Sequence, residues 1–110
     1  MNNLAQKGCE PLKDGDDSLS DDLKKDLLAQ ISDQWSLIED DSKLFRRFIF
    51  DDFKGALELA NKIGVLADKQ WHHPDLKVCF GKLEVVIWTH KIGNLLESDF
   101  ILAAKIDELF

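Results

Sequence analysis

The sequence predicts an α+β fold: a four-stranded antiparallel sheet with three helices packed on one face, in the order α-β-β-α-β-β-α. Two observations predict it. Apolar residues recur at the spacing of a helix face in three stretches of the chain. Between these stretches lie two pairs of short strand-like segments, each pair joined by a turn sequence, which is typical of antiparallel hairpins.

The length of 110 residues corresponds to a single domain. Its first part is polar and carries three carboxylates between Asp14 and Asp17, so it holds too little apolar surface to offset the entropy cost of ordering. We therefore expect a flexible acidic arm at residues 1–19 and one domain at residues 20–110.

The first helix is expected to begin after Ser20, a favourable N-cap residue that Asp21 and Asp22 follow in the first turn. Apolar residues then share one helical face: Leu23, Leu27, Leu28 and Ile31. Residues 35–39 form a short expected strand, and residues 40–42 form a turn.

The second expected strand, residues 44–50, has apolar side chains on both faces. Leu44, Phe48 and Phe50 share one face, and Phe45 and Ile49 share the other with Arg47. Because apolar side chains on both faces favour burial of both, we expect the outer face to pack against another element or subunit.

A longer helix follows, capped by Asp51 or Asp52. Its apolar stripe predicts about four turns with a core-facing side: Phe53, Ala56, Leu57, Ala60, Ile63, Gly64 and Ala67. Pro74 ends any helix, because the residue before a proline is pushed towards an extended conformation.

The second hairpin is expected at residues 76–80 and 83–90, where apolar and polar residues alternate on either side of a turn at Gly81. Gly93-Asn94 forms a loop, and the last helix begins at about Glu97.

The charge balance argues against two classes of partner. Fourteen Lys and Arg against twenty-one Asp and Glu give a net charge of −7, which disfavours direct nucleic-acid binding and an anionic membrane surface. No apolar run exceeds five residues, and the amino terminus has no apolar signal region. Cys9 and Cys79 form no C-x-x-C or zinc pattern, so we expect a reduced, cytoplasmic protein without a membrane partner.

All three histidines of the chain fall within nineteen residues: His72, His73 and His90. The first two lie where the long helix breaks and the third lies where a strand ends, so the three imidazoles could converge on one cleft. Because histidine titrates near neutrality, such a group can supply an acid and a base for a dehydration. Alternatively, the histidines could be helix caps or packed surface residues, or they could bind zinc. A zinc site is disfavoured, because adjacent residues on an extended backbone, such as His72 and His73, point to opposite sides.

Three carboxylates lie near the histidines in the sequence: Asp68, Asp75 and Asp99. Asp68 is four residues before His72, so it would face the same side of a helix and orient that imidazole, or it would only solvate the helix. Asp99, in the first turn of the last helix, could likewise only interact favourably with the helix dipole. Three aromatic residues could line a slot for a flat ring, or be core or interface residues: Trp71, Phe80 and Trp88.

These residues together resemble the signature of pterin-4a-carbinolamine dehydratases. The signature is an acidic residue, three spacers, His-His-Pro, an aromatic residue six positions after the proline, a histidine ten positions later and a further Asp. The residues of this chain that match are Asp68, His72, His73, Pro74, Phe80, His90 and Asp99. The similarity extends over about residues 20–110.

The resemblance implies an activity and an assembly. Members of the family dehydrate 4a-hydroxytetrahydrobiopterin to quinonoid dihydropterin, which recycles the cofactor of aromatic amino acid hydroxylases. They use no metal and no organic cofactor, and they assemble as homodimers or homotetramers on a fold of four antiparallel strands and three helices. The catalytic residues would be His72, His73 and His90, with the first and third as acid/base groups and His73 holding the pterin. Four residues would bind substrate: Asp68, Trp88, Thr89 and Asp99.

Some positions depart from the family pattern. Many relatives have Asp where this chain has Lys91, Gly where it has Asn94, and a capping Thr where it has Leu96. A second interpretation is also open, since family members serve as a dimerisation cofactor of a homeodomain transcription factor and related domains act as assembly scaffolds. The apolar outer face with Phe45 and Ile49 favours that non-catalytic role.

Overall fold

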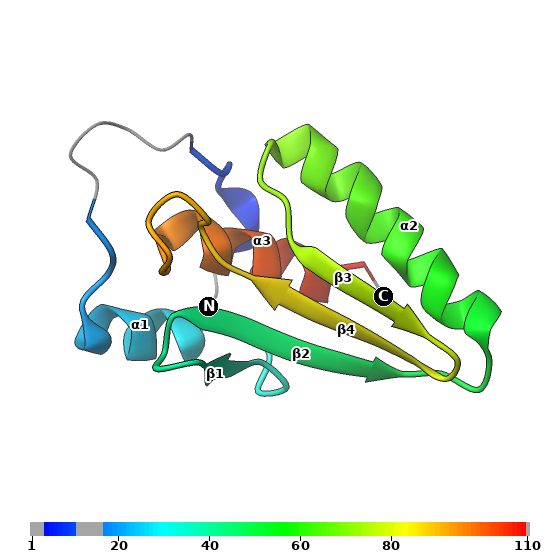
Figure 1. Cartoon of the computed structure of the whole chain (residues 1–110). Helices are drawn as coiled ribbons and strands as arrows, with labels where there is room; N and C mark the ends of the chain where they lie inside the picture. Colours follow the sequence, from blue (N-terminus) through cyan, green and yellow to red (C-terminus); the bar gives the residue numbers. More distant parts are fainter. Residues whose placement is uncertain (1–3, 11–16, 110) are drawn as a thin grey trace.

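The computed structural model describes residues 4–10 and 17–109 (Figure 1). Within them the predicted fold class and element order are confirmed, with one short 3-10 helix added near the amino terminus. The elements are η1 Leu4–Gln6, α1 Asp21–Leu28, β1 Ser36–Ile38, β2 Lys43–Ile49, α2 Phe53–Gln70, β3 Asp75–Cys79, β4 Lys82–Ile87 and α3 Glu97–Asp107.

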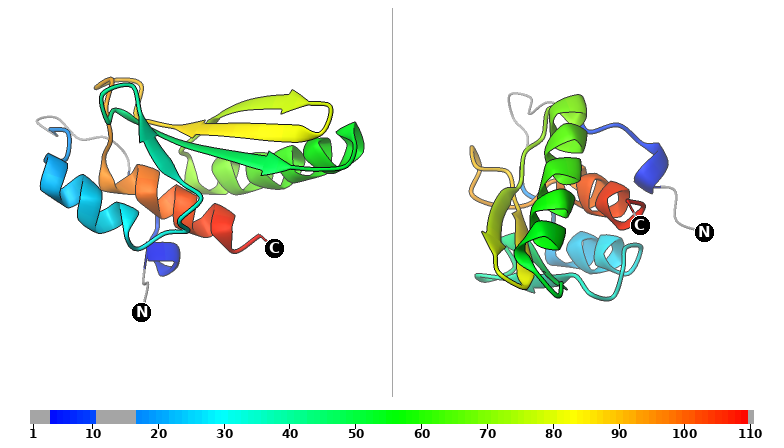
Figure 2. Two further views of the ribbon diagram at one scale, coloured as in Figure 1. Left: turned by 90° about the horizontal axis from the view of Figure 1, so that it is seen from below. Right: turned by 90° about the vertical axis from the view of Figure 1, so that its right-hand side faces the viewer.

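The four strands form one antiparallel sheet in the order β1-β2-β4-β3. Figure 2 shows α1, α2 and α3 on one face of this sheet. The central pairing sets Leu44 opposite Ile87 and Phe48 opposite Leu83, and all four side chains are buried towards the helices. This alternation in β2 and β4 fixes which sheet face forms the core.

Helix α3 lies at the centre of the molecule and contacts η1, α1 and α2. Every residue from Ser98 to Ala104 is buried, so this part of the helix is buried on all sides rather than along one stripe. The chain order therefore places Asp99, a carboxylate, in the first turn of the most buried helix.

Helix α2 is capped by Asp52, whose Oδ1 accepts a hydrogen bond from the Gly55 N–H at 2.8 Å. The predicted core stripe is correct only along its centre: Ala56, Ala60, Ile63 and Ala67 are buried. The prediction was wrong for Phe53 and Leu57, which are 46% and 42% exposed, whereas Leu59 is buried. Leu57 and Leu59 lie on opposite sides of the buried stripe of α2. The side that carries Leu59 faces the core, and the side that carries Leu57 faces solvent.

The strand ends differ by a few residues from the prediction. β4 stops at Ile87, and Thr89 instead pairs with Asn94 in an isolated bridge as the chain turns back. Phe80 lies beyond the end of β3 in the hairpin turn, where Gly81 has φ +81°. Its side chain is 77% exposed there, so Phe80 is not a core residue, and it does not line the pocket described below.

The outer face of the sheet is not covered by any element of the described residues. Phe45 is half-buried beside the Arg47 guanidinium, whose carbon lies 5.5 Å from the ring centroid. Ile49 is 74% exposed. The expectation that another element or subunit covers this face stays a prediction, because a single chain does not test it.

Residues 4–10, which belong to the expected flexible arm, pack along α3. Leu4 is only 2% exposed and belongs to the main core, and the Lys105 ammonium donates to the Ala5 carbonyl oxygen at 2.8 Å. Most of the acidic cluster of the arm, including Asp14 and Asp16, lies outside the described residues.

In the ranges that the structure covers, the helices are all too short or too polar to cross a lipid bilayer.

Candidate active site

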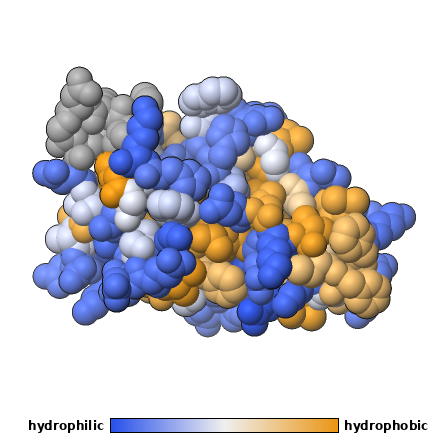
Figure 3. All heavy atoms as spheres, viewed as in Figure 1, coloured by the Kyte–Doolittle hydropathy of each residue, from blue (hydrophilic) through white to orange (hydrophobic). Residues whose placement is uncertain are grey.

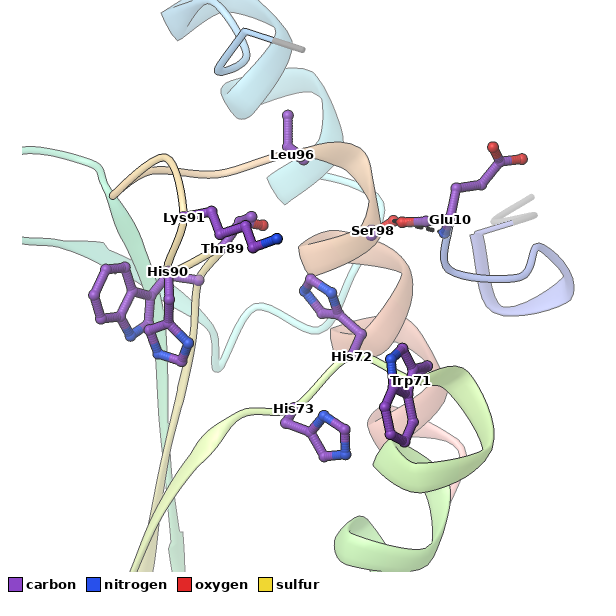
Figure 4. Close-up of a pocket in the computed structure, with 10 residues that line it drawn as sticks. Glu10, Trp71, His72, His73, Thr89, His90, Lys91, Leu96 and Ser98 are labelled. Carbon is purple, nitrogen blue, oxygen red and sulfur yellow. Dashed lines mark hydrogen bonds between the residues drawn. The ribbon is translucent and has the colours of Figure 1, made fainter. Parts of the chain in front are cut away.

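A pocket of about 440 Å³ opens where the end of α2, the end of β4 and the start of α3 meet. Figure 4 shows Trp71, His72 and His73 entering from the α2 end, and Thr89, His90 and Lys91 entering from the strand side. The lining residues are Glu10, Trp71, His72, His73, Trp88, Thr89, His90, Lys91, Leu96 and Ser98. The structure thus brings the three predicted histidines together at one hollow.

The end of α2 explains how two adjacent histidines reach the pocket. The helix ends at Gln70, and Trp71 adopts a left-handed conformation with φ 53° and ψ 41°. The backbone N–H groups of both Trp71 and His72 donate to the Ala67 carbonyl oxygen, which closes the helix end. The reversal separates His72 and His73 from the helix, so they do not continue its spacing.

His72 is held by a buried carboxylate. Its Nε2 lies 2.6 Å from Asp99 Oδ1, and Asp99 is fully buried. The second oxygen, Oδ2, accepts from the Thr89 hydroxyl and from the Leu96 N–H, each at 2.8 Å. Since an ionised carboxylate can only accept, Nε2 is the donor when it pairs with ionised Asp99, and Nδ1 is the ring nitrogen that this pair leaves unused.

His73 and His90 each face a carboxylate of their own, but at the surface. His73 Nε2 lies 3.0 Å from Asp68 Oδ1, and His90 Nε2 lies 3.6 Å from Asp75 Oδ1. The side chains of both histidines are about half exposed, at 49% and 52%, so solvent and salt screen these pairs. Only His72 therefore has a rigid, water-excluded partner.

The expected partner of Asp68 was wrong. Its place four residues before His72 predicted a pair with that ring, but it contacts His73 instead. The cause is the left-handed Trp71, which ends helical geometry one residue before His72. The carboxylate that pairs with His72 is Asp99, for which the sequence had also allowed a role at the helix terminus alone.

Aromatic rings support two of the histidines edge-on. The Trp88 and His90 centroids lie 4.1 Å apart at 80°, and those of Trp71 and His73 lie 5.5 Å apart at 78°. The Trp88 Nε1–H also donates to Asp75 Oδ2 at 3.0 Å, so one carboxylate orients both Trp88 and His90.

Thr89 lies at the centre of the site, but its polar groups are already engaged. Its hydroxyl donates to Asp99, its N–H donates to the Asn94 carbonyl oxygen, and its own carbonyl oxygen accepts from Ile92 and Gly93. Thr89 therefore shapes the site by holding Asp99.

Sequence reasoning missed two pocket residues, Glu10 and Ser98. They are 88 positions apart, yet the Glu10 N–H donates to the Ser98 hydroxyl at 3.0 Å. Next to them, burial raises the pKa of the Cys9 thiol to about 11, against the opposing effect of the Lys105 charge. No periodicity or motif signals a contact between a polar amino-terminal segment and a buried helix.

No group of three or more His, Cys, Asp or Glu side chains in the described ranges is arranged to hold a metal ion. Each histidine faces a different carboxylate, so the site is built from separate pairs rather than from one ligand set.

The structure is an α+β fold with a pocket lined by three histidines. The sequence model of the family described as pterin 4 alpha carbinolamine dehydratase matches residues 17–109. This chain belongs to that family of dehydratases.

Three similar proteins illustrate the match. A protein of Alkaliphilus metalliredigens (strain QYMF) that carries the family name is 46% identical over 98% of this chain and 96% of its own length. One of Rickettsia bellii (strain OSU 85-389) with the same name is 43% identical over 96% of this chain and 93% of its own length. The crystal structure of a transcriptional coactivator/pterin dehydratase from Brucella melitensis has the same fold, with a TM-score of 0.74, 24% identity and coverage of 82% of this chain and 95% of that one.

Proposed function

We propose that this protein dehydrates 4a-hydroxytetrahydrobiopterin, a pterin-4a-carbinolamine, to quinonoid dihydropterin by histidine acid/base catalysis. The observation that carries the proposal is the pocket in which His72, His73 and His90 meet, with His72 Nε2 held 2.6 Å from the buried Asp99. Membership of the dehydratase family gives the class of reaction, and the pairs give the groups that would perform it.

The reaction needs two proton transfers and no change in oxidation state. The C4a–O bond breaks and the hydroxyl leaves with a proton as water, while a ring nitrogen loses a proton and its electron pair forms the new C=N bond. One group must donate a proton and another must accept one, so two histidines near neutral pH suffice.

His72 and His90 are assigned as the acid/base pair. The proton on His72 Nε2 is fixed by Asp99, so Nδ1 exchanges the substrate proton and the carboxylate stabilises the imidazolium that forms. His90 stands on the opposite wall, is half exposed and can exchange its proton with water after each turnover. His73, supported by Asp68, holds the pterin.

The proposed position of the flat pterin ring is between groups from the two walls of the pocket. Trp71 and Trp88 both line the pocket and offer aromatic surface to a heterocycle. Asp68 and Asp99 support the site through their histidines, and Thr89 supports it through Asp99.

In the cell the protein would be a cytoplasmic homodimer or homotetramer that returns the pterin to aromatic amino acid hydroxylases. The same proposal includes a reaction that needs no metal and no organic cofactor. The net charge of −7 supports a role without direct nucleic-acid contact.

The test is a stopped-flow measurement of the decay of 4a-hydroxytetrahydrobiopterin with and without the purified protein. We expect catalytic amounts of the protein to accelerate decay, and we expect loss of that effect when His72, His73 and His90 are all replaced by Ala. A decay rate independent of the wild-type protein would rule the dehydratase proposal out.

A non-catalytic dimerisation cofactor or scaffold is the second candidate, and the uncovered sheet face with Phe45 and Ile49 favours it. The same triple variant separates the two. A scaffold keeps its effect in cells without the histidines, whereas an enzyme loses it.

A further inference from the structure

The amino-terminal segment, residues 4–10, spans from the core to the pocket. At one end Leu4 is buried beside α3, and the Ala5 carbonyl oxygen accepts from Lys105. At the other end Glu10 lines the pocket. Figure 1 shows this segment in dark blue beside α3 and reaching towards the upper end of α2.

Two successive residues of the segment bridge the ends of two helices. The Cys9 N–H donates to Gln70 Oε1 at 3.0 Å, and its thiol donates to the Ser98 carbonyl oxygen at 3.4 Å. The Glu10 N–H donates to Ser98 Oγ at 3.0 Å, and that hydroxyl donates back to the Glu10 carbonyl oxygen at 3.3 Å. The segment is therefore bonded to both α2 and α3 within two residues.

The two bridged residues stand next to the central pair of the site. Gln70 is the last residue of α2, two positions before His72, and Ser98 directly precedes Asp99. The short contact between His72 Nε2 and Asp99 Oδ1 depends on how these two helix ends are placed relative to each other. A bridge between them at Cys9 and Glu10 limits that relative movement.

We propose that the amino-terminal segment is a positioning element of the active site: it holds the end of α2 against the start of α3, so that His72 stays paired with Asp99. The inference rests on the proposed dehydratase function. Small misplacements of catalytic groups cost rate, so loosening this bridge should lower turnover.

The main test compares full-length variants that break the bridge with a control on the same segment. Gln70→Met removes the acceptor of the Cys9 N–H while keeping a good helix former, and Gln70→Glu restores an acceptor oxygen. Leu4→Asp releases the other end of the segment. Lys7→Ala is the control, because it keeps the backbone bond of Lys7 to the Leu4 carbonyl oxygen and removes only a solvent-screened ion pair with Glu97, 3.1 Å long with side chains 52% and 48% exposed.

Well below the melting temperature of each variant, we expect Gln70→Met to lower kcat by about fivefold with a much smaller change in KM, the effect of about one lost hydrogen bond. Leu4→Asp, which places a charge at a core position, should also lower kcat with a much smaller change in KM. Gln70→Glu should recover most of kcat, and Lys7→Ala should match the wild type. Wild-type kcat in both bridge-breaking variants would overturn the proposal.

A second readout does not depend on turnover. The Nε2–H of His72 donates to Asp99, so its imidazole ¹H–¹⁵N signal reports the pair directly. We expect faster exchange of this proton with water in Gln70→Met and Leu4→Asp, and wild-type exchange in Lys7→Ala. An inactive wild-type protein with these exchange changes would refute only the dehydratase function, whereas unchanged exchange in both variants would refute the positioning role.

Discussion

At the scale of single residues, Asp99 is the most tightly constrained side chain of the site. It is fully buried and contacts His72, Thr89 and the Leu96 N–H. It also stands in for the missing side-chain cap of α3, since Leu96 offers no polar side-chain atom. One carboxylate thus serves the helix terminus and the His72 ring together.

Asp99→Asn should therefore impair catalysis more than folding. The amide keeps the shape and can still accept from Leu96, but it no longer fixes the His72 tautomer with an ionised oxygen or stabilises the imidazolium. We expect kcat to fall by about 10²-fold or more. Steady-state kinetics beside thermal unfolding checks this, with Asp68→Asn as the exposed counterpart and an expected loss of less than about tenfold. Equal losses in the two variants would contradict the special role of the buried pair.

The Cys9 thiol gives a pH-dependent prediction. Because burial raises its pKa from 9.0 to about 11, the folded chain keeps the thiol proton where the unfolded chain loses it. The free energy of unfolding should thus fall between about pH 9 and pH 11, and this part of the fall should be absent in Cys9→Ala. Denaturant titrations of both chains at pH 8 and pH 10.5 measure it. Identical pH dependence would show that Cys9 is not buried in solution.

At the scale of elements, the turn after α2 determines the site. The sequence made the histidine group and the broken helix predictable, because Pro74 restricts the residue before it. It did not reveal the left-handed Trp71, since a bulky residue is an unusual C-cap where Gly is the common choice. That single backbone conformation pairs Asp68 with His73 instead of His72.

The orientation of α2 is tested by two neighbouring leucines. Leu59→Ala should destabilise the protein by about 2–4 kcal/mol, because Leu59 is 5% exposed within the core. Leu57→Ala should cost less than about 1 kcal/mol, since that side chain is 42% exposed. Chemical denaturation of both variants measures the difference, and a reversed order would favour the stripe expected from sequence.

At the scale of the whole molecule, the fold was predictable and the docking of the amino terminus was not. Helical and alternating patterns are local, so they survive in a single sequence. Leu4 contacts α3 although the two lie about 100 positions apart in the chain, and such a long-range contact leaves no local sequence pattern. The polarity of the first nineteen residues instead predicted a flexible segment. The unexpected pocket residues Glu10 and Ser98 belong to the same long-range contact.

One end of the molecule carries a group of exposed apolar side chains, visible as the orange area at the right of Figure 3. The end of β2, the start of α2 and the β3–β4 turn contribute Ile49, Phe53, Leu57 and Phe80, each more than 40% exposed. The Phe50 N–H donates to the Gly81 carbonyl oxygen at 2.9 Å, which joins the end of β2 to that turn. Such a patch supports the proposed homo-oligomer.

Replacing Ile49 by Lys should weaken that assembly. A charge at the centre of an apolar contact opposes burial, so we expect Ile49→Lys to shift sedimentation velocity towards the monomer. Leu23→Lys, at a half-exposed site on α1, is the matched control and should sediment like the wild type. A wild-type protein that is monomeric at micromolar concentration would contradict the oligomer.

The central claim is that His72, held by Asp99, transfers a proton at the dehydration step. Stopped-flow decay of 4a-hydroxytetrahydrobiopterin with wild-type protein and with His72→Ala at matched concentrations tests it most directly. We predict fast catalysed decay for the wild type and a rate at least about 10²-fold lower for a folded His72→Ala variant. Catalysis by His72→Ala at the wild-type rate would contradict the account.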